Sequence, residues 1–334
     1  MELSHMGRAL TTAVIFTLAG CGGAGTATSV PSAMTQSVAR HGGTSSDTDL
    51  LYETNGYVIN VLTYPQGQSV ATFNTEADPG AMCSDKNGNV FVTDANNSDI
   101  VEYSHGGTSP IATLKEFPNA PQACSVDAVS RNLAVANGGA TFEHGNIAVF
   151  ASAQGTPTYY TAPNIYSYAF CTYDSNGNLF VDAGGNDGKS HLIEMPNGSG
   201  NFQDITVHGA AMQDAQSLQW DGANLALALP SIHLKGRHYF KGPLSIYVLH
   251  VSGLVAKVVK KVNLRSSKKN RHLGYDVQYW IQGNVIMGQN GTSGTGLGLW
   301  NYPAGGKPIQ VLVPHTNVGG VTVSVAPSDA RIHK

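Results

Sequence analysis

The sequence predicts an all-β fold, a six-bladed β-propeller of four-stranded blades whose first blade is closed by the C-terminal strand. A repeat with a period of about 40–50 residues, filled with short strands, is typical of propeller blades. An incomplete repeat stands at each end of the chain, and the 334 residues include 39 glycines but only 12% charged residues. Many glycines and few charges suit a chain with many tight turns between short strands.

The repeat is a turn, then Asn, then an apolar strand, then Asp or Asn. It occupies residues 85–94, 127–137 and 174–182, with weaker copies at 221–228 and 282–289. Its anchoring asparagines follow one another at steps of 43, 46, 46 and 60 residues: Asn89, Asn132, Asn178, Asn224 and Asn284. Two further strands, separated by Gly- and Pro-rich turns, follow in each repeat, and their period-2 alternation indicates half-buried strands.

The two chain ends hold complementary parts of a repeat. Residues 51–73 resemble its third and fourth strands without a first, and residues 320–327 resemble a first strand with nothing after it. If the two fragments pair, they make one composite blade beside the five internal repeats. Closing the ring in this way removes exposed sheet edges.

The segment Asp85-Lys-Asn-Gly-Asn-Val-Phe-Val-Thr-Asp94 resembles the motif of NHL-repeat and SMP-30/gluconolactonase-like six-bladed propellers. The resemblance spans roughly residues 50–327 and implies a fold more than an activity. In the lactonase-like members, acidic and amide side chains at the channel mouth hold a divalent metal. The matching positions are the ends of the second strands, namely Asp94, Asn137, Asp182 and Gln289.

This metal interpretation has a structural alternative. Asp and Asn at the ends of strands often cap tight turns through bonds to nearby backbone N–H groups. The sequence also departs from the lactonase pattern, because Ala228-Leu-Pro230 interrupts the ring of ligands and Gly320–Pro327 offers no glutamate.

The N-terminus is predicted to be a signal peptide over residues 1–20. Arg8 supplies the positive charge, and the apolar run 9–18 is too short to span a bilayer. Leu18-Ala19-Gly20-Cys21 resembles a lipobox, which implies a lipid on Cys21, with an ordinary secretory signal as the alternative. The Gly- and Ser-rich residues 21–49 then form a flexible tether to a single propeller domain at 50–334. The expected location is the bacterial cell envelope, at the outer membrane or the periplasmic face.

Three cysteines, Cys83, Cys124 and Cys171, take the same place in successive repeats and should lie on neighbouring inner strands. The favoured interpretation is that each cysteine is reduced and buried, and packs as a small apolar side chain near the axis. One disulfide is an alternative, although the spacing between adjacent blades is expected to be wide for it. Zinc binding is a third, less favoured one, because closely spaced Cys pairs are missing.

Charge is unevenly placed along the chain. No Asp or Glu occurs between Gly222 and Tyr275, and this stretch holds ten cations: Lys235, Arg237, Lys241, Lys257, Lys260, Lys261, Arg265, Lys268, Lys269 and Arg271. Positive charges that lie close together repel one another, and an anionic partner relieves this repulsion. The expected partners are an anionic envelope polymer, lipid phosphates or a protein, and nucleic acid is not expected. The alternative is that the patch pairs with acidic loops or is merely solvated.

The sequence contains no nucleophile elbow, phosphate loop or paired histidines that would assign a reaction. We therefore expect a binding or scaffold module with no catalytic residue and no cofactor. The alternative is a metal-dependent lactonase- or esterase-like hydrolase that holds one divalent metal such as Ca²⁺ at Asp94, Asn137 and Asp182.

Overall fold

The computed structural model describes residues 47–75, 79–115, 119–138, 144–213, 216–235, 238–267, 278–291, 295–314 and 316–327, without the side chains of residues 231–243. The predicted signal peptide, Cys21 and the tether up to residue 46 lie outside this part of the chain. Arg237, Lys268, Lys269 and Arg271 also lie outside it. Within the described residues, no helix has the length and apolar character that a membrane crossing requires.

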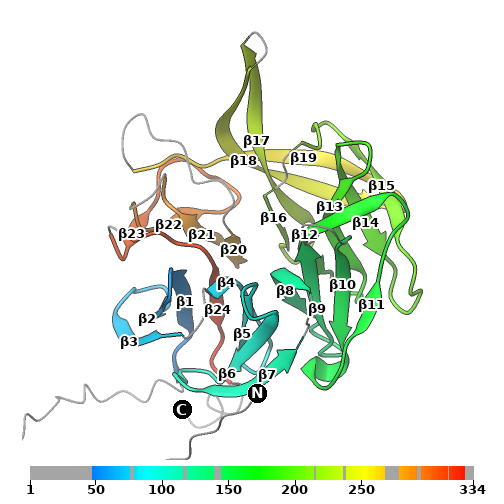
Figure 1. Ribbon diagram of the computed structural model, residues 1–334. Helices are drawn as coiled ribbons and strands as arrows, with labels where there is room; N and C mark the ends of the chain where they lie inside the picture. The colour runs from blue at the N-terminus through cyan, green and yellow to red at the C-terminus, as the bar shows by residue number, and fades with distance from the viewer. Residues whose placement is uncertain are drawn as a thin grey trace, which may run out of the picture. The chain divides into compact units, whose positions relative to one another are not determined.

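The described residues fold almost entirely as antiparallel sheets (Figure 1). Four sheets have four strands each. The first contains β24 (Val321–Ser324), β1 (Leu50–Asn55), β2 (Val58–Thr63) and β3 (Ser69–Asn74). The second contains β4 (Pro79–Ser84), β5 (Val90–Asp94), β6 (Asp99–Tyr103) and β7 (Pro110–Lys115). The third contains β8 (Ala120–Val126), β9 (Leu133–Gly138), β10 (Asn146–Phe150) and β11 (Thr158–Tyr160).

The remaining four-stranded sheet contains β20 (Tyr279–Gln282), β21 (Val285–Gln289), β22 (Leu297–Asn301) and β23 (Gln310–Leu312). A fifth sheet has eight strands. One half of it contains β12 (Ile165–Tyr173), β13 (Leu179–Gly185), β14 (Ser190–Met195) and β15 (Gln203–His208). The other half contains β16 (Ser217–Trp220), β17 (Leu225–Lys235), β18 (His238–Ser252) and β19 (Val255–Asn263). A parallel pairing of β15 with β19 joins the halves.

The sequence repeat corresponds to one structural unit, a capped turn followed by a second strand. Asp174 Oδ1 accepts hydrogen bonds from the backbone N–H groups of Asn176 at 2.8 Å and Asn178 at 2.9 Å. Asp85 makes the same bonds in its own repeat. The carboxylate fixes the turn, and the apolar strand begins at the residue after the repeating Asn. The predicted second strands are thereby confirmed.

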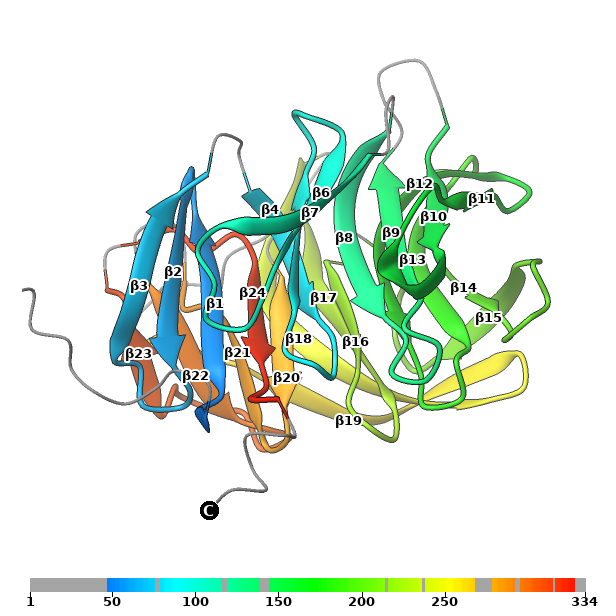
Figure 2. The ribbon, with the colours of Figure 1, turned by 90° about the horizontal axis from the view of Figure 1, so that it is seen from below.

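The C-terminal strand completes the first sheet, as the sequence predicted. β24 pairs antiparallel with β1, with Leu51 opposite Val323 and Glu53 opposite Val321. Figure 2 shows the red strand β24 beside the blue strand β1. All four residues of β24 are buried, so the strand covers an edge of β1 that would otherwise be open.

The prediction for residues 51–73 was wrong in one respect. This segment supplies three strands, β1 to β3, and not only the third and fourth strands of a blade. Gly56 and Tyr57 make the tight turn between β1 and β2, with Gly56 at φ 56°. A two-residue hairpin turn needs positive φ at its first position, which glycine adopts readily.

The first strands of successive sheets contact one another in a closed order: β24, β4, β8, β12, β16, β20 and again β24. Clusters of buried apolar side chains fill the space between neighbouring sheets. Phe91 of β5 packs with Leu133 and Phe150 of the third sheet, for example. Leu51 and Val323 of the first sheet pack with Leu297 of β22, which closes the order. The arrangement of the sheets is therefore propeller-like.

The fourth repeat differs most from the others, as its long step of 60 residues indicated. The sequence predicted inserted loops there. The structure instead extends β17 and β18 into a long hairpin, paired as far as Lys235 opposite His238 (Figure 1, top). Two of the predicted patch residues, Lys235 and Lys241, lie on this hairpin.

Candidate functional site

One mouth of the central channel holds a cavity of about 340 Å³. The amide side chains of Gln122, Gln216 and Gln278 line it, together with Gly80 and Ser167. Gln278 bridges two first strands, since its Oε1 accepts from the backbone N–H of Met82 at 2.8 Å and of Val321 at 3.1 Å. The mouth is thus lined by neutral groups, and Asp94, Asn137 and Asp182 are not among its lining residues.

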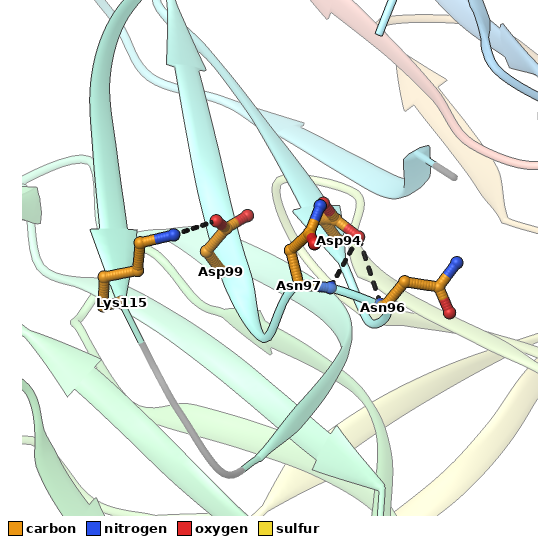
Figure 3. Close-up of polar contacts among 5 residues, drawn as sticks. All are labelled: Asp94, Asn96, Asn97, Asp99 and Lys115. Atoms are coloured by element: carbon orange, nitrogen blue, oxygen red, sulfur yellow. Dashed lines mark hydrogen bonds and ion pairs between the residues drawn. The ribbon is translucent and has the colours of Figure 1, made fainter. Parts of the chain in front are cut away.

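Asp94 caps the turn that follows β5 (Figure 3). Its Oδ1 accepts from the backbone N–H groups of Asn96 and Asn97, both at 3.1 Å. Its Oδ2 accepts from Asn97 Nδ2 at 2.7 Å. The carboxylate is 2% exposed, and these donors satisfy both of its oxygens. This arrangement matches the structural alternative given for the residue from sequence.

The other proposed ligands are also buried away from the channel cavity. Asn137 Nδ2 donates to Asn146 Oδ1 at 2.8 Å, and the Oδ1 atom of Asn137 has no hydrogen-bond partner. Asp182 lies opposite Phe170 and Leu192 and is 2% exposed. Burial raises the pKa of Asp182 to about 7, because it disfavours the charged form.

Gln289 ends β21 and donates from Nε2 to the backbone oxygen of Gly291 at 3.0 Å. In the part of the chain that the structure describes, no group of three or more His, Cys, Asp or Glu side chains is placed to hold a metal ion. The residues predicted to bind a divalent metal, Asp94, Asn137 and Asp182, therefore lie on three successive sheets. Each has its own local surroundings there.

The cysteines correct the favoured prediction of reduced side chains. Cys83 and Cys124 form a disulfide with their Cα atoms 5.6 Å apart, so neighbouring first strands are close enough for the bond. Cys171 is buried and forms no disulfide, as the sequence predicted, and its Sγ lies 3.7 Å from the backbone oxygen of Ala134. All three line a cavity of about 160 Å³ within the channel.

Apart from Lys235 and Lys241 on the β17–β18 hairpin, the described cations of the basic stretch lie on and just beyond β19. Lys257, Lys260, Lys261 and Arg265 are exposed. Lys261 Nζ lies 5.0 Å from the ring centroid of Tyr247, a cation–π geometry. Among the described residues, no carboxylate lies within ion-pair distance of these four cations.

A larger hollow of about 580 Å³, which the sequence analysis did not anticipate, lies over the second sheet beside the end of β3. Asp94, Asn97, Asp99 and Lys115 are among its lining residues (Figure 3). Lys115 Nζ lies 2.5 Å from Asp99 Oδ2. The only sequence signal was that Asp99 begins a predicted third strand and Lys115 follows a predicted fourth one, so the two could face each other across a hairpin.

Comparison with known proteins identifies the fold of this chain and nothing beyond the fold. No family model matches the chain, and no curated protein matches it by sequence. Solved structures do match. One is a nidogen/laminin complex, at a TM-score of 0.57 and 13% identity, covering 84% of this chain and 99% of that chain. Another is a protein of unknown function from Bacteroides caccae, at a TM-score of 0.57 and 12% identity, covering 83% and 99%.

A third similar structure is the hydrazine synthase of Kuenenia stuttgartiensis, at a TM-score of 0.52 and 12% identity, covering 77% of this chain and 74% of that one. Together with the arrangement of the sheets, these likenesses establish a β-propeller. At such low identities they carry no information about ligand or activity.

Proposed function

We propose that this protein is an envelope-anchored β-propeller lipoprotein that acts as a binding module for an anionic ligand, which it contacts through the cations of β19. The observation that carries the proposal is the placement of Lys257, Lys260 and Lys261. They are exposed on one strand, and no described carboxylate pairs with them. Unpaired cations on an ordered strand attract phosphate, sulfate or carboxylate groups of a polymer or membrane.

The strand register strengthens this proposal. Lys257 lies opposite His250, and Lys260 lies opposite Val248. Because residues two apart on β18 share a face, the two lysines also share a face, roughly 7 Å apart along the strand. They do so only because a bulge at Val259 inserts one extra residue between them. The bulge therefore places two cations side by side.

We also propose six blades, with the eight-stranded sheet counting as two. The closed order of six first strands supports this count. So does the buried cluster in which Phe180 and Leu192 of one half of the large sheet pack against Leu227 and Leu249 of the other half. The two halves behave as neighbouring blades whose outer strands, β15 and β19, happen to pair. The resemblance to NHL-repeat and SMP-30-like propellers supports the same architecture.

The test of the ligand proposal is binding of the full chain to heparin and to vesicles that contain phosphatidylglycerol, measured over a range of salt concentrations. The variant Lys257→Gln/Lys260→Gln/Lys261→Gln should bind roughly a hundredfold more weakly at low salt, since each cation near an anionic surface contributes about 1 kcal/mol. Extending the change to Lys268 and Lys269 should weaken binding further.

Lys189→Gln is a matched control. Its side chain is 73% exposed on a different part of the fold and lies 3.3 Å from Asp187. This variant should bind the same probes as the parent chain does. If the triple variant binds as tightly as the parent chain at low salt, the proposal is wrong. If Lys189→Gln loses as much affinity as the triple variant does, the binding depends on net charge and not on the cations of β19.

The anchor is tested separately. In bacteria that express the full chain and are fed labelled palmitate, the protein should carry the label, and Cys21→Ser should abolish the labelling. The hydrolase alternative remains a prediction from the resemblance. Elemental analysis of the purified chain for a divalent metal, together with lactone and ester turnover, tests it.

A further inference from the structure

The eight-stranded sheet has a surface where its two halves join. There β15 and β19, the outer strands of the two halves, run parallel and pair over residues 206–208 and 255–257 (Figure 1). One face of this junction is covered, because Val207 and Ala256 pack in the cluster of apolar side chains between the halves. The opposite face is open, since Thr206, His208 and Lys257 are exposed.

Three basic side chains form a row across the open face. His208 of β15 lies opposite Lys257 of β19, and Lys257 lies opposite His250 of β18. Residues directly opposite each other share a face, and adjacent strands are about 4.8 Å apart, so this basic row spans roughly 10 Å. All three residues are exposed. Lys260 lies on the same face, because it is opposite Val248, two residues before His250.

The carboxylates near the basic row are directed elsewhere. The other described charged residues and histidines on the adjoining strands and turns are Asp187, Lys189, His191, Glu194, Asp204, Asp221, Lys260 and Lys261. Asp187 and Asp204 lie 3.1 Å and 3.7 Å from the two ring nitrogens of His191. Asp221 accepts from Tyr302 Oη at 2.7 Å.

Glu194 lies on the covered face of the sheet, because it is opposite Phe180 of the apolar cluster. Within the described part of the chain, no carboxylate therefore comes within ion-pair distance of the basic row. The row presents its donors to solvent.

The number and charge of these donors favour one kind of anionic group. A phosphate monoester carries about −1.5 to −2 charge at pH 7 and has three terminal oxygens that accept hydrogen bonds. Lys257 supplies an ammonium, and each histidine, when protonated, supplies an N–H group from both ring nitrogens. A sulfate ester has three such oxygens but a single charge, and a carboxylate has only two oxygens. The row therefore matches a phosphate monoester in both respects.

We propose, building on the proposed function of β19, that the anionic group is a phosphate monoester whose terminal oxygens accept hydrogen bonds from His208, Lys257 and His250. Lys260 adds a further positive charge beside this site. The bound dianion stabilises the protonated form of both imidazole rings, so binding takes up protons from the solution. Lysines alone would bind a polyanion without this uptake, because they are already charged at neutral pH.

The test is calorimetry on the full chain at low salt and pH 7, with phenyl phosphate and phenyl sulfate as probes and two buffers of different ionisation enthalpy. We expect phenyl phosphate to bind with a Kd of about 1 mM or tighter and with proton uptake. Phenyl sulfate should bind at least about fivefold more weakly. His208→Gln/His250→Gln should weaken phosphate binding roughly tenfold or more and remove the uptake. Both residues are exposed, so a folding defect is not expected.

His144→Gln is the matched control, since His144 is exposed between β9 and β10. This variant should bind phenyl phosphate as the parent chain does. Vesicles that contain phosphatidic acid, a monoester, or phosphatidylglycerol, a diester, separate the two sources of the phosphate. Histidine-dependent binding to phosphatidic acid vesicles and not to phenyl phosphate assigns a lipid headgroup. Histidine-dependent binding to phenyl phosphate without a preference between the vesicles assigns a soluble phosphate.

The phosphate proposal is overturned if neither phenyl phosphate nor phosphatidic acid vesicles bind saturably, or if phenyl sulfate binds as tightly as phenyl phosphate. It is also overturned if His208→Gln/His250→Gln binds like the parent chain. Heparin binding separates this failure from failure of the proposed function. If only the triple lysine variant loses heparin binding and the histidine variant keeps its phosphate binding, the proposed function stands without the phosphate site.

Discussion

Cys83 is joined to Cys124 by a disulfide, and the bond ties the first strand of the second sheet to the first strand of the third. It lies in the channel, where both cysteines line the cavity of about 160 Å³. Neighbouring sheets are otherwise held together mainly by apolar packing. The disulfide is therefore a covalent link across an interface that would have to open when the ring unfolds.

Removal of this disulfide should destabilise the protein. The two cysteines are separated by 41 residues, for which the chain-entropy model gives a loss of about 4 kcal/mol in the free energy of unfolding. We expect Cys83→Ala/Cys124→Ala to lose roughly 2–4 kcal/mol in urea denaturation. Cys171→Ala is the control and should lose less, because it removes only buried volume. An unchanged midpoint for the double variant would contradict the stabilising role.

The capped turns give a second prediction. Asp174 Oδ1 accepts from two backbone N–H groups, and Oδ2 accepts from Asn178 Nδ2 at 2.9 Å. Asp174→Ala leaves those donors without their acceptor, so the free energy of unfolding should fall by roughly 2 kcal/mol. Asp174→Asn keeps one acceptor oxygen and should lose clearly less. Equal losses for Asn and Ala would mean that the turn does not depend on these bonds.

These turns also show how much of the fold could be predicted from the sequence alone. The turn, the Asn and the apolar strand lie within ten residues of one another, so local chemistry sets the repeat and the start of β5 at Val90 could be predicted. The pairing of β24 with β1 was predictable because each chain end carried an incomplete repeat. The hairpin turn at Gly56 was signalled locally by its glycine and was nevertheless missed.

Features that depend on packing between distant segments were not predictable in this way. The parallel pairing of Thr206 with Val255 follows from how two sheets pack, and no local pattern encodes it. The same holds for the 5.6 Å approach of Cys83 and Cys124. The contact of Asp99 with Lys115 requires the register of β6 and β7, which only the folded chain supplies.

Ring closure gives a third prediction. A chain that ends at residue 320 lacks β24, which exposes the edge of β1 and uncovers the apolar cluster around Leu51 and Leu297. We expect this truncated chain to aggregate or to lose its cooperative unfolding transition, as open apolar edges do. A synthetic peptide of residues 316–327, added during refolding, should restore the transition, and a scrambled peptide should not. A truncated chain with the midpoint of the full chain would contradict closure by β24.

The pH dependence of stability gives the fourth prediction. Burial raises the pKa of Asp182 from 3.8 to about 7, and that of Glu53 from 4.5 to about 7. Between about pH 4 and pH 7 the folded chain therefore holds protons on these groups that the unfolded chain has released. Stability rises with pH only where the unfolded state binds more protons, so here it must fall as the pH increases. Below about pH 4 both states are protonated, and the stabilisation by the neutral acids is fully present.

Asp182→Asn isolates one of these groups, because the amide is neutral at every pH and has nearly the shape of the protonated acid. The variant and the parent should have similar unfolding free energies near pH 4. At pH 8 the variant should be more stable, by roughly 2–4 kcal/mol, since it no longer buries a charge. Chemical denaturation across this range measures the difference, and the exposed Asp204→Asn should track the parent throughout. Parallel curves for Asp182→Asn and the parent would show that folding does not raise the pKa of Asp182.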